Sequence, residues 1–177
     1  MAKSRPSGAA RKADADADSG LLREDASSFV LTDEVRNSVL NGELKAISVD
    51  DGRTMLSQGF SVTATDGNNY SFGSDLVIKY EHGIKQEGQV KKEGTDINRF
   101  RHIPFAVHAL KSPNSDIYIK QGRINQKLFI CRHSDRTVTA VYVNSDNRAV
   151  RSYIYTNRSK RQVDKFIESR KEGFEKA

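Results

Sequence analysis

The sequence has little of what stabilises secreted or membrane-bound proteins. Its one cysteine, Cys131, cannot form an internal disulfide, and residues 1–12 lack the apolar core of a secretory signal. No stretch approaches the roughly 20 apolar residues that cross a bilayer. These absences exclude a disulfide-stapled fold and predict a chain that works in a reducing compartment and has no membrane as partner.

Motifs of several enzyme classes are also absent. The chain has no Gly-x-x-x-x-Gly-Lys-Ser/Thr phosphate loop, no His-Glu-x-x-His motif and no Gly-x-Ser-x-Gly motif. Asp50-Asp51-Gly52 and Asp66-Gly67-Asn68 resemble pieces of a calcium loop without its closing glutamate, so we interpret both as turns. No group of cysteines and histidines has the spacing of a zinc site, so the sequence predicts neither a metal nor a cofactor.

Composition divides the 177 residues into regions. Residues 1–20 have no large apolar side chain after Met1 and cannot bury enough surface to offset the entropy of ordering, which predicts a disordered tail. The alternative is a tail that tethers the protein to a larger assembly. The polar stretch 83–94 predicts a linker. We therefore expect a small N-terminal α+β module over 21–90 and a second domain over 95–177.

The charge is divided unevenly between the two halves. Residues 1–99 hold 13 basic and 16 acidic side chains, a balance of −3, whereas residues 100–177 hold 16 and 7, a balance of +9. Such asymmetry predicts RNA or another nucleic acid as partner of the second half. The alternative is a solvated cationic surface without a ligand.

The N-terminal module shows three local patterns. A capping Thr32 and a terminal Gly42 predict a short helix between them. Alternation over 60–65 and 70–72, on either side of a polar turn, predicts a β-hairpin, and residues 76–80 predict a further strand. None of these patterns indicates a site.

The basic half has a pattern of helix, four strands and helix. Apolar residues from Ile97 to Leu110 recur at steps of three and four, and Pro104 predicts a break at Ile103. Strands are predicted at 116–120, 127–132, 137–143 and 150–156, with connections short enough for an antiparallel meander.

The terminal helix is predicted from a capping box formed by Ser159 and Gln162. The fold class is therefore α+β: short helices, a four-stranded antiparallel sheet and a C-terminal helix. We expect the helices to cover one sheet face and to leave the other free for a ligand. The apolar stripe of the terminal helix is expected to comprise Val163, Phe166, Ile167 and Phe174.

One strand could supply a binding surface on the free face. Arg151, Tyr153 and Tyr155 alternate with smaller residues and would point the same way, beside Tyr118 and Lys120. Exposed, they would offer charge to phosphates and aromatic rings to bases. The alternative is that both tyrosines pack against the terminal helix and that Arg151 extends past them to solvent.

Four segments of the second half resemble phage-encoded members of the barnase, EndoU, colicin and RelE class of metal-independent ribonucleases. They are residues 101–105, 109–114, 117–119 and 153–158, and the likeness covers about residues 95–170. The resemblance implies RNA cleavage without a metal, and delivery into the cytoplasm of a host cell, with packaging in a virion. The glutamate that serves as general base in barnase-like members has no counterpart, because the four predicted strands contain no glutamate.

The implied chemistry needs a base, an acid and cations on the phosphate. His102 matches the resembling position, His108 is the alternative, and His133 is a third candidate acid. Cys131 is interpreted as a small buried apolar residue. The predicted catalytic residues are His102, His108, Arg132 and Thr156. The predicted nucleic-acid-binding residues are Lys111, Lys120, Arg151, Tyr153, Tyr155 and Arg158.

Three functions remain open from the sequence. The first is a phage-type protein that cleaves or binds RNA, and the second is a non-catalytic virion or host-takeover protein that holds nucleic acid or a host protein. The third is a protein adaptor in which the positive charge is incidental. Cleavage in EDTA would identify the first, salt-sensitive binding without product the second, and no binding at low salt the third.

Overall fold

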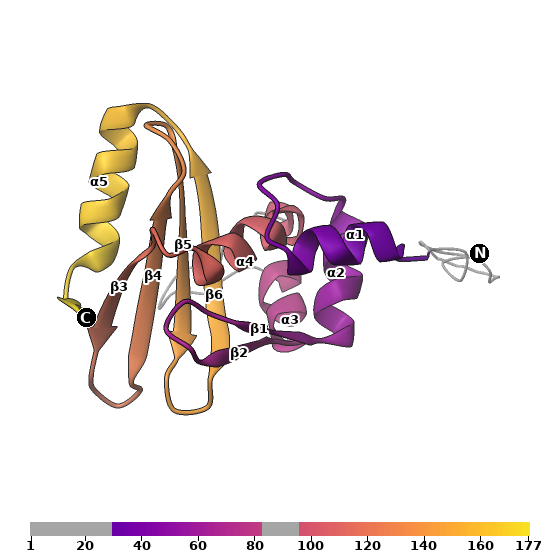
Figure 1. Ribbon diagram of the computed structural model, residues 1–177, viewed down its shortest axis with the longest axis horizontal. Helices are drawn as coiled ribbons and strands as arrows, with labels where there is room; N and C mark the ends of the chain where they lie inside the picture. Colours follow the sequence, from indigo (N-terminus) through magenta and orange to yellow (C-terminus); the bar gives the residue numbers. More distant parts are fainter. Residues whose placement is uncertain (1–29, 83–95) are drawn as a thin grey trace. The chain divides into compact units, whose positions relative to one another are not determined.

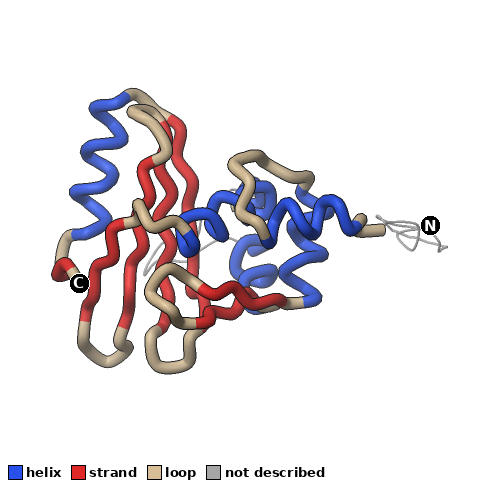
Figure 2. Tube along the Cα trace, viewed as in Figure 1, coloured by secondary structure: helices blue, strands red, loops and turns tan. Residues whose placement is uncertain are grey.

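The computed structural model describes residues 30–82 and 96–177 (Figures 1 and 2). The predicted tail and the predicted linker lie outside the described residues. Asp33–Ala177 forms one compact unit, and its class is α+β, as predicted. The helices are α1 (Asp33–Leu40), α2 (Val49–Gln58), α3 (Asp75–His82), the 3₁₀ helix η2 (Ile97–His102), α4 (Ile103–Lys111) and α5 (Lys160–Lys171).

The strands form one seven-stranded mixed sheet in the order β1-β2-β6-β5-β4-β3-β7. The predicted four-stranded antiparallel meander is its centre, and the predicted hairpin extends it beyond β6 through a parallel bridge from Ser71 to Ala149. The prediction of four strands was too low because pairing between distant segments leaves no local mark in the sequence. The strands are β1 (Phe60–Thr63), β2 (Asn69–Phe72), β3 (Asp116–Lys120), β4 (Gln126–Arg132), β5 (Thr137–Asn144), β6 (Ala149–Asn157) and β7 (Glu175–Lys176).

Local sequence signals set several of these boundaries. Ser159 caps α5 and exchanges hydrogen bonds with Gln162, which confirms the capping box. Pro104 lies in the first turn of α4, where its missing N–H costs nothing, so the predicted break becomes the junction of η2 and α4. Gly42 follows α1 with φ of 67°, as a terminal glycine should.

Two predictions in the N-terminal half were wrong. The expected strand over 76–80 is part of α3, since Leu76 and Tyr80 are both fully buried and lie one helical turn apart. The expected turn at Asp50-Asp51-Gly52 is the first part of α2. There Ser48 accepts a hydrogen bond from the Asp51 N–H (3.0 Å), and the carboxylates favour the positive end of the helix dipole.

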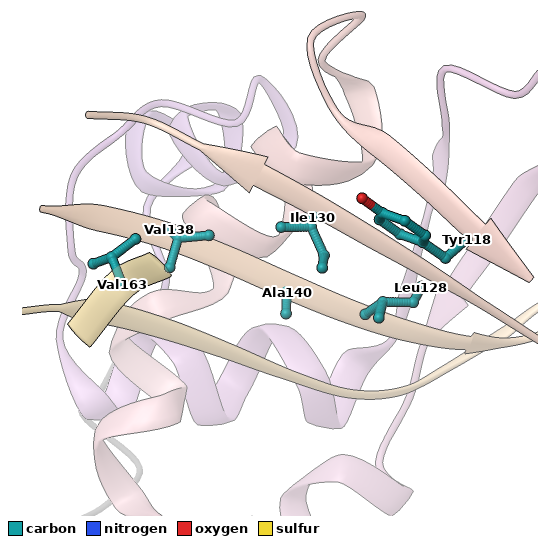
Figure 3. Packing of buried hydrophobic residues seen from close by; sticks show 6 residues of the cluster. All are labelled: Tyr118, Leu128, Ile130, Val138, Ala140 and Val163. Atoms are coloured by element: carbon teal, nitrogen blue, oxygen red, sulfur yellow. The ribbon is translucent and has the colours of Figure 1, made fainter. Parts of the chain in front are cut away.

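Both faces of the sheet are covered, which contradicts the predicted free face. On one face, α5 packs on apolar residues of β3, β4 and β5 through Val163 (Figure 3). On the other face lies α4, on the same side as α1, α2 and α3 (Figure 1). The α5 stripe predicted from sequence is confirmed for Val163, Phe166 and Ile167. Phe174 packs against the same cluster but lies beyond the end of α5, so its predicted place on the helix was wrong.

The predicted division into two domains is also not what the structure shows. Tyr80 of α3 lies edge-on to Tyr153 of β6, with ring centroids 5.3 Å apart, and its hydroxyl accepts the Tyr153 N–H (3.0 Å). Asp66, in the hairpin turn, pairs with Lys127 of β4 at 2.8 Å. The two segments therefore share one core. No helix in 30–82 or 96–177 has both the length and the apolar composition needed to cross a bilayer.

Candidate functional site

Three histidines lie on the side of the sheet that α4 covers. His102 immediately precedes α4, His108 belongs to it, and His133 directly follows β4. The ring of Tyr155 on β6 lies near two of them, with its centroid 5.0 Å from that of His102 and 6.2 Å from that of His133. The fold thus gathers imidazoles from distant parts of the chain.

The closest grouping consists of His108, Cys131 and His133, which we call the HCH cluster. One ring nitrogen from each histidine and the Cys131 sulfur all lie within 4.8 Å of one another. The Cys131 Sγ is 3.8 Å from His133 Nδ1, and the two imidazole centroids are 5.3 Å apart. Cys131 is 2% exposed, which agrees with the predicted burial.

In each imidazole of the HCH cluster, one ring nitrogen lies within hydrogen-bond distance of an oxygen atom. His108 Nδ1 is 3.1 Å from the Gly42 carbonyl, and His133 Nε2 is 2.7 Å from the Thr139 hydroxyl. A Cβ on Gly42 would come within 2.9 Å of the His108 backbone, so only glycine permits this approach. Strand register places Thr139 directly opposite Cys131.

Burial favours the neutral form of two of these histidines. It lowers the pKa of His133 to about 4, and the charge of His108 adds to the effect. It also lowers the pKa of His102, with smaller contributions from Arg101 and Arg99. Neutral imidazoles carry a free lone pair at neutral pH and can accept a proton or bind a metal.

A group of exposed cations lies at one end of the sheet. The β4–β5 turn and the connection from β6 to α5 meet there (Figure 1). The N–H of Arg158 donates to the Arg136 carbonyl (2.9 Å), and Arg136 Nε donates to the Arg158 carbonyl (3.2 Å). We call this group the basic edge; its members are Arg132, Arg136, Arg158, Lys160 and Arg161.

The structure does not bring the four predicted catalytic residues into one site. His102 and His108 lie on the α4 side. Thr156 pairs with Val138, whose side chain faces α5, and Arg132 forms an ion pair with Asp164 of α5 at 2.7 Å. The four residues are separated because Thr156 and Arg132 point to the α5 face of the sheet, whereas His102 and His108 belong to the helical segment that covers the other face.

The predicted ladder of Arg151, Tyr153 and Tyr155 is not an exposed surface. Tyr153 is 1% exposed and its hydroxyl donates to the Arg99 carbonyl (2.8 Å). Tyr155 stacks on Phe105 with centroids 4.0 Å apart, and Arg151 is half-buried, its carbonyl bonded by Lys79. The tyrosines pack under η2, α3 and α4 rather than against the terminal helix.

The other predicted cations do not share a groove. Lys111 donates to the Leu40 carbonyl (3.2 Å), and Lys120 lies 5.6 Å from the centroid of the Phe174 ring. Lys120 pairs with the first residue of β4, whereas Arg132 is its last, so the two cations are at opposite ends of that strand. Of the predicted binding residues, only Arg158 joins Arg132 at the basic edge.

Sequence reasoning missed both groupings. Cys131 and His133 are two positions apart and so share a strand face, which is a signal for a site, but nothing local connects them to His108. Arg136, Lys160 and Arg161 lie in a turn and at a helix start, where cations are common on any surface.

Comparisons with known protein families, with curated proteins and with solved structures find no match. The ribonuclease resemblance therefore stays a prediction.

Proposed function

We propose that this protein binds RNA and that the basic edge holds its phosphates. The proposal depends on one observation: β-sheet pairing brings together five exposed cations from two separate segments, 132–136 and 158–161. Four of them are arginines, and a guanidinium can donate two parallel hydrogen bonds to a phosphate.

Neighbouring carboxylates leave this group with a net positive charge. Asp164 binds Arg132 and also Lys160, the latter at 3.3 Å, and Asp135 lies in the turn. Across residues 132–136 and 158–164, five basic and two acidic side chains leave a balance of 5 − 2 = +3. A local excess of this kind attracts a polyanion and releases its counterions.

Binding is better supported than cleavage, because the predicted catalytic residues lie on two sides of the sheet. Cleavage of RNA, packaging in a virion and action in a host cell stay predictions. So does the alternative of a non-catalytic protein that binds a host protein.

The test compares two double variants with the same change of charge. In Arg136→Glu/Arg158→Glu the basic edge loses two cations; in Arg123→Glu/Arg148→Glu two exposed cations are lost from turns at the other end of the sheet. We expect fluorescence anisotropy with labelled single-stranded RNA to show at least about tenfold weaker binding for the first and less than about threefold for the second. The logarithm of the wild-type binding constant should fall linearly with the logarithm of salt concentration.

Two results would overturn the proposal: no binding by the wild type at low salt, or equal losses in the two double variants. The same RNA incubated with protein in EDTA reports on cleavage separately. Fragments would add an activity to binding, and intact RNA would reject only the cleavage prediction.

A further inference from the structure

The HCH cluster has the donor set of a transition-metal site. Two imidazole nitrogens and one thiolate are the ligands that zinc prefers in proteins. The cluster combines one residue from α4, one from β4 and one from the residue after β4. It shares no residue with the five cations of the basic edge, although His133 follows Arg132 directly, and the inference below does not depend on RNA binding.

The spacing fits tetrahedral coordination. With Zn–N and Zn–S bonds of about 2.0 and 2.3 Å, the ligand atoms of a tetrahedral site lie about 3.3–3.7 Å apart. The measured distance from Cys131 Sγ to His133 Nδ1 is 3.8 Å, and the three candidate atoms lie within 4.8 Å. Side-chain shifts of roughly an ångström would complete the geometry.

Hydrogen bonds determine which ring nitrogen of each histidine keeps a free lone pair. The Gly42 carbonyl can only accept, so the hydrogen bond at 3.1 Å puts the proton of His108 on Nδ1 and leaves the lone pair on Nε2. Thr139 Oγ1, at 2.7 Å, can accept a hydrogen bond from the Nε2–H of His133, which leaves the Nδ1 lone pair free on the Cys131 side. Metal-binding histidines are oriented in this way by a second partner.

From this geometry we propose that His108, Cys131 and His133 bind one zinc ion. The ion replaces the thiol proton, which passes to solvent as the Zn–S bond forms. Three protein ligands leave a fourth coordination position for water. Bound zinc would link α4 to β4. Because His108 is hydrogen-bonded to the Gly42 carbonyl, the loop after α1 would also be held to this site.

The first experiment uses the full chain, stripped of metal with EDTA and titrated with Co²⁺ and then Zn²⁺. We expect one Co²⁺ per chain, with visible bands typical of tetrahedral cobalt and a near-ultraviolet band from thiolate-to-cobalt charge transfer. Zinc should displace the cobalt and raise Tm by at least about 5 °C. A cobalt spectrum without the thiolate band, or no binding, would overturn the proposal even if no variant folds.

Variants then assign the ligands. Cys131→Ala and His133→Asn should each weaken zinc binding at least about 100-fold, measured by competition with a chromophoric chelator. The matched control is His102→Asn, which removes a half-buried imidazole on the same side of the sheet and should leave zinc affinity within about threefold. Equal zinc affinity in wild type and Cys131→Ala, or equal losses in the control, would refute the assignment.

Thr139 is expected to act as a positioning residue. Thr139→Val removes the oxygen beside His133 Nε2 and should weaken zinc binding about 10- to 100-fold, whereas Thr139→Ser should restore it. Because valine keeps the shape of threonine, a similar Tm for the two metal-free variants would separate orientation of His133 from packing. An unchanged zinc affinity in Thr139→Val would contradict the role of this hydrogen bond.

Discussion

Asp66 shows how one side chain holds two parts of the fold together. Its carboxylate accepts hydrogen bonds from the Asn68 N–H (3.0 Å), the Tyr70 hydroxyl (2.6 Å) and Lys127 (2.8 Å), and its side chain is 11% exposed. Burial alone would raise the pKa of Asp66. The hydrogen bonds from Lys127, Tyr70 and Asn68 together lower it by more than burial raises it, so the pKa lies below its usual value. Burial, assisted by Asp66, raises the pKa of Tyr70 to about 12.

We therefore predict an acid-dependent contribution from Asp66. Because its folded pKa is below the unfolded one, near 3.9, its stabilising effect is complete above that value and is lost as pH falls through the folded pKa. Asp66→Asn should lower the free energy of unfolding at pH 7 by about 1–3 kcal/mol and flatten the dependence on pH below about 4. Urea unfolding across the pH range measures both effects.

The control for this prediction is Asp135→Asn, at an exposed carboxylate in the β4–β5 turn. It should change the free energy of unfolding by less than about 0.5 kcal/mol. If the free energy of unfolding of Asp66→Asn changed with pH in parallel with that of the wild type at all pH values, the assigned role would be contradicted.

At the scale of elements, the packing of α2 on η2 requires a glycine. A Cβ on Gly52 would lie 1.9 Å from the Phe100 carbonyl oxygen, far inside van der Waals contact. Glycine normally weakens a helix, yet here it lets the two backbones approach closely.

The expected effect of Gly52→Ala is therefore a loss of stability. Helix propensity alone would stabilise α2 by about 1 kcal/mol, but the clash with η2 should dominate and leave a net loss of about 1–3 kcal/mol. Thermal and urea unfolding measure the change. Gly122→Ala is the matched control, because a Cβ there meets no atom within 4 Å, and a stabilised Gly52→Ala would show that the helices can separate at little cost.

For the whole molecule, the central fact is a core that both segments share. Tyr80 and Phe72 of the first segment are almost fully buried and lie near Tyr153 of the second. Burying side chains of this size contributes about 1.5–3 kcal/mol each, so neither segment can lose the other without exposing its core.

This predicts that a fragment of residues 96–177 does not fold cooperatively, although it contains the predicted nuclease-like domain. Circular dichroism during heating and amide NMR dispersion test this directly. The matched control is a fragment of residues 30–177, which keeps every described buried contact and should unfold within about 2 °C of the full chain. A sharp unfolding transition in the shorter fragment would mean that the basic half is an independent domain.

Much of the element order was readable locally. Alternation over β3–β6, the Ser159 box, Pro104 and the Asp66-Gly67-Asn68 turn each act over a few residues, and each appears as expected. The charge imbalance was likewise a property of composition. The segment 76–80, predicted as a strand and found in α3, shows where local prediction fails. A short apolar run fits both the helical period and the strand period until the buried residues are known.

Long-range contacts had no such local signal. The bridge from Ser71 to Ala149, the meeting of Arg136 with Arg158, and the approach of His108 to Cys131 all join positions far apart in the chain. Side-chain period defines which residues share a face of one element, but it does not say which elements pack together. That choice depends on the summed burial and hydrogen bonding of the whole core, and for this reason the candidate zinc ligands and the basic edge emerge only from the folded chain.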